Sequence, residues 1–414
     1  MGAPQRAAAP AAPGYRRIFA VPGFPSLVGA SLLARTGQQM STVALVLFVL
    51  ARGGSGGLAG TVVFLLLGPG LAISPIAGAL LDRHGRIRLV TVDYLVAAVA
   101  LALLVVLDAA GGLPAVALCL IVGAGSLTYP LSNSGTRSLF PLVLPEELWD
   151  RANALDSGMY VVAMIAGPAI AGAAVAISGT RAALVVDAAV YLAAAVAVRT
   201  ATEPRVTSER RPLLQDARAG IAYVVRSRSL RSLALCLSVY NVGSGMVVVA
   251  LPLLVIQRFG GGGEEVGALF ALQGVGGVAG ALAAAAIGSQ EREREHVAGG
   301  MILSVVALAL VATANAPWQA ALGMLVLGAS NGPIDIGLFG LRQRRTERAW
   351  VGRVFAISMA FNFCGYPIGS LLGGPVAGRA PGIAFVVAAV AAAGGAAIAW
   401  GGIPAEPEPP PQIG

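Results

Sequence analysis

The sequence predicts an all-α membrane protein in which twelve transmembrane helices form two pseudo-symmetric six-helix halves around a central cavity. The first observation is composition: 57% of the 414 residues are hydrophobic and 12% are charged, with a mean hydropathy of +0.79. Soluble domains carry about 25% charged residues. The second observation is the length of the apolar runs, because a membrane-spanning helix needs about 20 mostly apolar residues. Barrel strands need only about ten residues and alternate polar with apolar side chains, so these runs indicate helices.

Twelve apolar runs qualify as spans, six on each side of a hydrophilic stretch near the middle of the chain. They are rich in Ala, Leu, Val and Gly, which suits helices that pack closely in lipid, because small side chains let backbones approach. In chain order, the expected spans are 24–50, 58–81, 89–110, 113–136, 153–178, 182–198, 231–256, 265–288, 297–314, 317–341, 353–378 and 382–402.

The hydrophilic segments set the domain boundaries. The longest one separates the two halves and contains an amphipathic piece from Leu213 to Val225. Both ends of the chain are rich in Pro and are expected to be disordered. The expected parts are a cytoplasmic tail over 1–23, a six-helix half over 24–198, a cytoplasmic linker over 199–230, a second six-helix half over 231–402 and a cytoplasmic tail over 403–414.

The two halves repeat one plan. Gly125 and Pro130 in the fourth span are matched by Gly328 and Pro333 in the tenth, at an offset of 203 residues. Ordered matches at a nearly constant offset indicate internal duplication, which in membrane transporters places a cavity at the interface of the repeats near the midplane. A second set of matches has an offset of 202 residues and pairs Gly167 and Gly172 with Gly369 and Gly374.

The placement of charge predicts the topology. The chain has no Lys, so its 28 basic residues are all Arg, and its formal net charge is +8. With the amino terminus inside, 23 of them fall in cytoplasmic segments and 4 in outer loops. This asymmetry follows the positive-inside rule, so both termini are expected in the cytoplasm. The basic pI therefore reflects topology and predicts no nucleic-acid partner. The Ala-rich, Lys-free composition suggests a bacterial inner (plasma) membrane.

Several function classes are disfavoured by what the sequence lacks. Without Lys a Walker A loop is impossible, so ATP cannot drive this chain by itself. Cys119, Cys236 and Cys364 lie far apart inside expected spans, and His84 and His296 lie in loops. We therefore expect no disulfide, no metal site and no cofactor. No cluster of catalytic residues is visible, which argues against an enzyme.

The connection between the second and third expected spans has a distinctive sequence. Residues 78–88 read Gly-Ala-Leu-Leu-Asp-Arg-His-Gly-Arg-Ile-Arg. A short basic link is typical of the cytoplasmic side, and its glycines permit a close helix approach and a tight reversal. The spacing resembles the signature loop of the major facilitator superfamily. The matching positions are Gly78, Asp82, Arg83, Gly85, Arg86 and Arg88.

Three further stretches, 137–155, 165–172 and 352–369, extend the resemblance over nearly the whole chain. The pattern is most similar to the twelve-span drug/proton antiporters of the macrolide-efflux type. The stretch 165–172 resembles the antiporter motif, in which a Gly-Pro pair bends the helix at the gate. The expected bend involves Gly167, Pro168 and Gly172. Unlike many of these antiporters, the fourth span is expected to carry no buried Arg.

This resemblance implies a function and a gating contact. It implies a monomeric, secondary-active exporter of amphipathic small molecules (a drug or natural product), driven by the proton gradient through alternating access. Asp82 would pair with Arg86 and face the amino end of span eleven near Arg353, where an anion is favoured. That contact would latch the outward-open state. The alternatives are an importer or metabolite carrier on the same fold, and a membrane enzyme or sensor.

Polar residues inside the spans mark a candidate pathway for substrate or protons. A charged side chain in the membrane is costly and faces a partner or water. Arg35 could hold an anionic substrate group, tune a proton-carrying carboxylate, or pair with an Asp on another helix. Asp156 and Asp335 with Asn331 are the candidates for the proton site, unless they serve interhelical contacts. Four amides are expected to line the cavity or join helices: Gln38, Gln39, Asn241 and Asn362.

Three other acids lie in or near the spans. Asp187 falls in the outer third of the sixth span. Asp93 and Asp108 lie near the two ends of the third span and are expected to be solvated.

Overall fold

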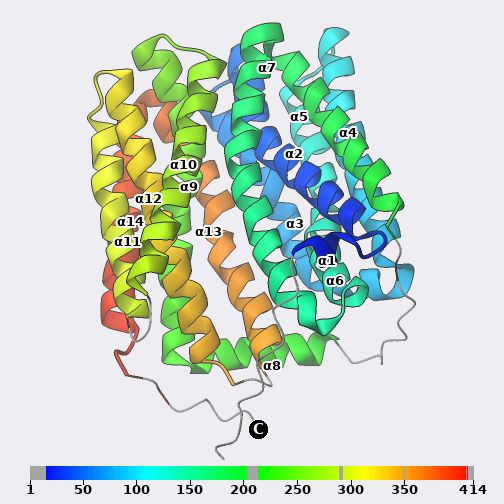
Figure 1. The fold of residues 1–414 in the computed structure, drawn as a ribbon. Coiled ribbons are helices and arrows are strands. Elements are labelled where there is room, and N and C mark those ends of the chain that lie inside the picture. The colour runs from blue at the N-terminus through cyan, green and yellow to red at the C-terminus, as the bar shows by residue number, and fades with distance from the viewer. Residues whose placement is uncertain are drawn as a thin grey trace, which may run out of the picture.

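The computed structural model describes residues 15–201, 203, 213–288, 292–347, 350–406 and 408. Every regular element within these ranges is a helix, and most helices stand side by side in one upright bundle (Figure 1). A short helix, α8 (Leu213–Arg226), lies across one end of the bundle, at the bottom of Figure 1. We call this end the α8 end and the opposite one the far end.

The first half runs from α1 to α7. Gly85, with φ of 87°, joins α3 to α4 in a one-residue reversal, because glycine adopts positive φ without steric cost. Ser55 caps α3, since its hydroxyl oxygen accepts from Leu58 N at 3.1 Å. The elements are α1 (Tyr15–Phe19), α2 (Phe24–Ala51), α3 (Gly56–His84), α4 (Arg86–Ala109), α5 (Ala115–Ser126), α6 (Tyr129–Val143), the 3-10 turn η1 (Glu146–Leu148) and α7 (Trp149–Arg199).

The second half follows α8. Ser227 caps its first long helix by accepting from Leu230 N at 3.3 Å. A π-helical turn, η2 (Val255–Phe259), prolongs that helix at the far end. The α-helices are α9 (Arg228–Leu254), α10 (Gly263–Ile287), α11 (Glu293–Ala312), α12 (Pro317–Arg344), α13 (Val351–Arg379) and α14 (Pro381–Gly402).

The number of spans depends on how α7 is divided. Within the described residues, ten helical segments are long and apolar enough to cross a membrane. α7 counts once among them, but its helical geometry breaks at Gly179 (φ 82°, ψ 175°), and its two limbs correspond to the fifth and sixth expected spans. α13 corresponds to the eleventh expected span but is not among the ten. The all-α membrane fold is confirmed, and the number twelve stays a prediction.

Two expected boundaries differ in the structure. Tyr15–Phe19 form α1, in which Ile18 is fully buried, so part of the expected tail packs against the bundle. Residues 1–14 of that tail lie outside the described residues. The fourth span does not end at 136 but continues through α6 to Val143. Its polar residues interrupt the apolar run because they face the interior of the protein, as described below.

The lateral surface of the bundle suits a bilayer. Large apolar side chains are exposed on helices of both halves, including Val99, Ile177, Leu282 and Val390. Soluble monomers rarely expose extensive apolar surface, whereas lipid-facing helices require it.

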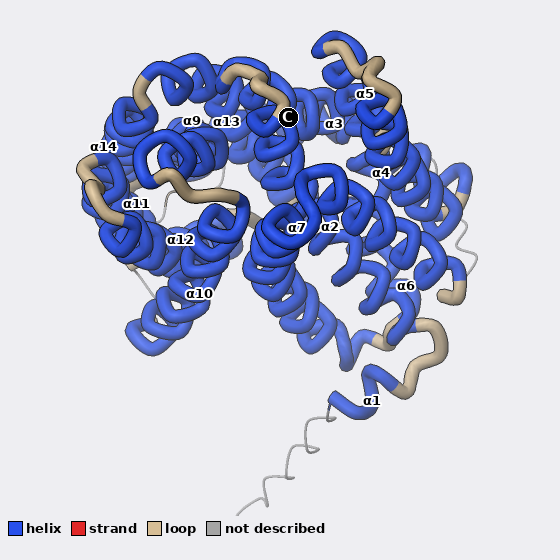
Figure 2. The backbone as a smooth tube through the Cα atoms, turned by 90° about the horizontal axis from the view of Figure 1, so that it is seen from above, coloured by secondary structure: helices blue, strands red, loops and turns tan. Residues whose placement is uncertain are grey.

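The two halves meet closely at the far end. A Cβ atom on Gly60 of α3 would clash with the carbonyl oxygen of Ser370 in α13. A Cβ atom on Gly172 of α7 would clash with the carbonyl oxygen of Gly263 in α10. Backbones this close require glycine at the contact. Figure 2 shows α9 to α14 gathered on one side and α2 to α6 on the other, so these two contacts join one half to the other.

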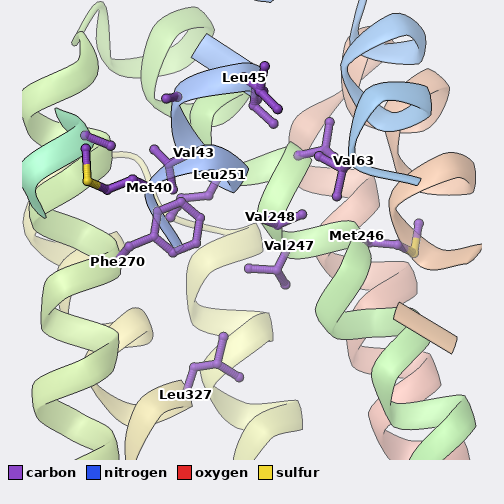
Figure 3. Close-up of a cluster of buried hydrophobic side chains, with 14 of the residues drawn as sticks. Met40, Val43, Leu45, Val63, Met246, Val247, Val248, Leu251, Phe270 and Leu327 are labelled. Carbon is purple, nitrogen blue, oxygen red and sulfur yellow. The ribbon is translucent and has the colours of Figure 1, made fainter. Parts of the chain in front are cut away.

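Apolar side chains of both halves converge next to these contacts. Figure 3 shows Val43 of α2 beside Leu251 of α9, with Val247, Val248 and Phe270 close by. All five side chains are buried. We call these five residues the apolar plug. Together with the glycine contacts, the plug closes the far end of the interface between the halves.

Candidate functional site

A cavity of about 770 Å³ lies between the two halves. Small-molecule sites typically measure about 300–1,000 Å³. Residues of α2 to α7 form one wall, and residues of α9 to α14 form the other. Val43 and Phe270 of the apolar plug line it toward the far end, whereas Arg137 and Met359 line it toward the α8 end. Because the far end is sealed by close helix contacts, the cavity is reached from the α8 end.

Seven of the eight residues expected on the pathway line this cavity. They come from both halves, as a path between the halves requires. The exception is Asp156, which is buried behind the wall. The seven lining residues are Arg35, Gln38, Gln39, Asn241, Asn331, Asp335 and Asn362.

Asp156 is the centre of an ion triad in the first half. Arg35 Nη2 lies 2.5 Å from Asp156 Oδ1, and Arg35 Nη1 donates to the Asp156 backbone oxygen at 2.7 Å. Arg137 Nε lies 3.3 Å from the other carboxylate oxygen. Of the three roles open to Arg35, the structure therefore contains the interhelical pair with an Asp. Two guanidinium groups share one carboxylate, so the triad leaves one positive charge on the cavity wall.

Arg137 was not expected at this place. It lies one residue beyond the expected end of the fourth span at 136, and that span was expected to carry no buried Arg. Because the span continues to Val143, Arg137 lies inside α6 and lines the cavity. The sequence signal was the polar stretch 132–136 before it, at which the expected span ended.

The second half places a neutral polar network on the opposite wall. Tyr240 of α9 donates to the Asn331 side-chain oxygen of α12 at 3.1 Å, and its hydroxyl also lies 3.1 Å from Ser304 Oγ of α11. Ser304 Oγ lies 2.6 Å from Ser330 Oγ. These contacts join three helices of the second half. Asn331 was expected here, but Tyr240 was not singled out.

Asp335 lies one helical turn from Asn331 and is exposed to the cavity. Among the residues that the structure describes, its carboxylate has no hydrogen-bond or ion-pair partner. Tyr160 of α7 lines the cavity from the opposite half. Asp335 is therefore free to interact with a bound solute. The triad places a positive charge on the wall of the first half, and Asp335 places a negative charge on the wall of the second half.

The amides of the second half other than Asn331, namely those of Asn241 and Asn362, lie where α9 meets α13. Asn241 Nδ2 donates to the backbone oxygen of Asn362 at 2.9 Å. Asn362 is itself buried and, in its alternative amide orientation, accepts from Arg342 Nη2 at 2.5 Å. Both amides therefore line the cavity and also join helices, so the two expected roles coexist.

The signature loop lies at the α8 end and has the expected pairing. Arg86 Nη2 donates to Asp82 Oδ1 at 2.5 Å, and Arg86 Nε donates to Ser138 Oγ of α6 at 3.0 Å. Gly85 makes the tight reversal described above. Arg83 and Arg88 are exposed. The loop is thus held to α6, inside its own half.

Gly78 of this loop does not make the close approach expected of it. It is exposed, and nothing lies within 4 Å of the position that a Cβ atom would take. The expectation of a close helix contact at Gly78 is therefore wrong for the described residues. Arg353, the expected partner region of the loop, lies in the first turn of α13, and its side chain falls outside the described residues.

Glu203 also binds the signature loop, although nothing in the sequence singled it out. Its carboxylate accepts from the backbone N–H groups of Arg86 at 2.9 Å and Ile87 at 3.0 Å, at the start of α4. An acid at a helix amino terminus satisfies free N–H groups and the helix dipole. It lies 117 residues from Arg86 in the chain, so only the fold reveals the contact.

The expected antiporter bend serves close packing in this structure. A Cβ atom on Gly167 would lie 2.5 Å from Gln39 Cβ of α2, and Gly172 contacts α10 as described. Pro168 lies within α7 and lines the cavity. The break in helical torsion angles at Gly179 separates the two limbs of α7 and is distinct from the expected bend at Pro168, which stays a prediction.

The two acids at the ends of the third span are buried, so the expectation that they are solvated is wrong. Asp93 accepts from Thr128 Oγ1 at 2.6 Å. Asp108 pairs with Arg52 Nε at 2.9 Å and also with Arg181, at the far end of the first half. Both find partners on neighbouring helices, which the sequence of one span cannot indicate.

An all-helical membrane bundle with a solute-sized cavity between two halves, sealed at one end and charged on both walls, defines a membrane transporter rather than an enzyme. Residues 12–403 match the family described as transmembrane secretion effector, and the chain belongs to this family of major facilitator superfamily transporters. The family match spans both halves and the cavity.

Relatives of known class are similar over most of their length. An uncharacterized MFS-type transporter, y4rN, of Sinorhizobium fredii is 37% identical over 383 residues, covering 91% of this chain and 94% of the relative. The multidrug efflux pump Tap of Mycolicibacterium fortuitum is 25% identical over 363 residues, covering 85% and 88%. Tap of Mycobacterium tuberculosis is 27% identical over 362 residues, covering 84% and 85%.

Solved structures share the fold at low sequence identity. A crystal structure of a mutant of the nucleoside transporter NupG superposes with a TM-score of 0.73 at 13% identity, covering 91% of this chain and 98% of NupG. A bacterial homolog of the human lysosomal transporter Spinster, in an inward-facing and unoccupied conformation, has a TM-score of 0.68 at 13% identity, covering 92% and 94%.

Proposed function

We propose that this transporter exports amphipathic small molecules from the cytoplasm in exchange for protons, by alternating access of the cavity between its two halves. The observation that carries the proposal is the cavity itself, which is mostly apolar yet exposes Arg35, Arg137 and Asp335. Such a wall suits a bulky molecule with an apolar body and a charged group. The similarity to the efflux pump Tap supports export.

In this proposal the α8 end faces the cytoplasm. The signature loop and α8 carry the Arg-rich segments, and such segments remain inside. The structure then corresponds to the inward-open state, in which a solute enters from the cytoplasm. Rocking of the halves would close the α8 end and open the glycine contacts and the apolar plug at the far end.

The signature loop would act in the outward-open state. Asp82 is exposed in the present conformation and pairs with Arg86. When the α8 end closes, Asp82 would meet the amino end of α13 near Arg353, where a helix dipole favours an anion. The proton gradient is the energy source in this proposal, and the chain acts as a monomer in the bacterial plasma membrane.

A test uses cells that lack their own efflux pumps. Accumulation of ethidium and of a panel of dyes and antibiotics is measured for the wild type and Asp82→Asn, with and without a protonophore. Glu147→Gln, an exposed acid of η1, is the matched control. The proposal expects lower accumulation with the wild type and the control, abolished by the protonophore and by Asp82→Asn. Equal accumulation with and without the protein, for every compound, would contradict export.

A further inference from the structure

We propose that Asp187 is a proton-binding site of this transporter, reached from the cavity through the hydroxyl group of Ser41. Asp187 lies on the second limb of α7 and is fully buried. The inference rests on the proposed function and deepens it, because it identifies where a coupled proton would reside.

The carboxyl group of Asp187 is only half satisfied. Ser41 Oγ of α2 donates to its Oδ2 at 2.6 Å. Its Oδ1 has no hydrogen-bond partner among the described residues. A Cβ atom on Gly37 of α2 would lie 3.1 Å from this oxygen, so glycine backbone covers it tightly. A buried carboxylate in this position would be a charge without compensation, which is costly. Binding a proton removes that charge.

Within the described ranges, the groups that face Asp187 supply no positive counter-charge. On its own helix, Tyr191 packs beside it against Gly37. On α4, Tyr94 contacts the Tyr191 ring, and Asp93 lies next to Tyr94 in the chain. On α2, Arg35 is engaged by Asp156. The environment therefore consists of two phenols, a second acid and a guanidinium group that another carboxylate already holds.

Three other acids of this half are buried, namely Asp93, Asp108 and Asp156. Asp156 is held by two arginines, and so is Asp108. A carboxylate with two guanidinium partners has its charge compensated and serves to hold neighbouring segments together. Asp187 is fully buried and has a hydroxyl group as its partner, as Asp93 has in Thr128. Asp93 itself lines the cavity, so Asp187 is the member of this set that lies behind the wall without a guanidinium partner and gains from binding a proton.

A short route connects Asp187 to the cavity. Ser41 and Tyr191 both line the cavity, whereas Asp187 lies behind them. As a proton enters, Ser41 Oγ accepts it from a hydronium ion in the cavity, which becomes water, and passes its own proton to Asp187 Oδ2, so the hydroxyl group is regenerated. Release runs in reverse. Because the cavity changes sides when the halves rock, a proton taken up on one side can be released on the other.

The first test needs no substrate. Infrared spectra of the purified full chain in liposomes are compared between wild type and Asp187→Asn near neutral pH. We expect the wild type to contain a carbonyl band of a protonated carboxylic acid that the variant lacks. Asp108→Asn is the matched control, because it removes a buried acid that is ion-paired, and it should leave that band in place. Ser41→Ala should shift the band, since it removes the hydrogen bond.

The outcome that overturns the inference is a protonated-acid band that is identical in wild type and Asp187→Asn. If Asp187→Asn does not fold, an unshifted band in Ser41→Ala overturns it instead.

A second measurement follows ethidium in membrane vesicles. Asp187→Asn should exchange ethidium down its gradient and lose accumulation driven by a pH gradient. If the wild type itself fails to accumulate ethidium, the proposed function is in doubt while the infrared result still decides the proton site.

Discussion

Arg35 Nη2 of α2 lies 2.5 Å from Asp156 Oδ1 of α7, and Arg137 of α6 holds the second oxygen of the same carboxylate. Three helices of the first half are therefore tied together at the wall of the cavity. An ion network of this kind cross-links the three helices, and in the proposed alternating-access motion it would keep the first half rigid and fix the position of the charge on the wall.

The triad should show strong energetic coupling. Arg35→Gln and Asp156→Asn should each lower the unfolding temperature in detergent, and Asp156→Asn should lower it more, because it leaves two cations unpaired. The double variant should lose less than the sum, with a coupling energy of about 0.5–3 kcal/mol. Additive losses would mean that Arg35 and Asp156 do not stabilise each other.

Asp335 should contribute to binding of cationic solutes. It is exposed to the cavity and unpaired among the described residues. Asp335→Asn should weaken ethidium binding about tenfold, which corresponds to loss of one charge-assisted contact of about 1.5 kcal/mol. Asp335→Glu should retain part of the affinity. Fluorescence polarisation of ethidium measures both, with exposed Glu264→Gln as the control. Unchanged affinity in Asp335→Asn would remove this residue from the site.

The glycine contacts at the far end should be required to close it. In Gly60→Val, the new side chain would clash with the Ser370 carbonyl of α13. We expect this variant to remain open at the far end and to lose transport. Gly29→Val is the control, because nothing lies within 4 Å of a Cβ atom on Gly29.

A cysteine in the apolar plug reports the state of that end. In a background with Cys119, Cys236 and Cys364 replaced by Ala, Val247→Cys should react with an impermeant maleimide from the far side in Gly60→Val. It should react slowly in the Gly29→Val control. Equal reactivity in both would show that Gly60 does not govern closure.

Glu203 should stabilise the signature loop. Glu203→Gln weakens acceptance from the N–H groups of Arg86 and Ile87 and removes the charge at the start of α4. We expect a loss of about 0.5–2 kcal/mol in unfolding free energy, as for other helix caps. Thermal unfolding in detergent checks this, and Glu146→Gln, an exposed acid of η1, should have little effect. Equal effects of the two substitutions would assign the loss to general surface charge.

The helices could be predicted because length and hydropathy determine what a bilayer accepts. The tight reversal at Gly85 and the Asp82–Arg86 pair were also predictable, since both depend on residues a few positions apart. Most pathway residues were found by asking which polar side chains lie inside apolar runs. A polar group in the membrane must face a partner or water, so these side chains can be identified as pathway candidates from the sequence alone.

The partners themselves were not predictable. Arg137 was placed outside the membrane because the polar cavity-facing residues of α6 lower the hydropathy of that span. Glu203 and Asp108 find their partners on other helices, at separations that only the fold brings together. Gly78 was expected in a close helix contact, which the described residues do not contain.

Proton-driven export is tested by ethidium transport into liposomes that contain the purified chain and no ATP, with an imposed pH gradient. With the lumen acidic, ethidium should accumulate inside, and collapse of the gradient with a protonophore should release it. Uptake equal to that of protein-free liposomes, or uptake that ignores the gradient, would contradict proton-driven export.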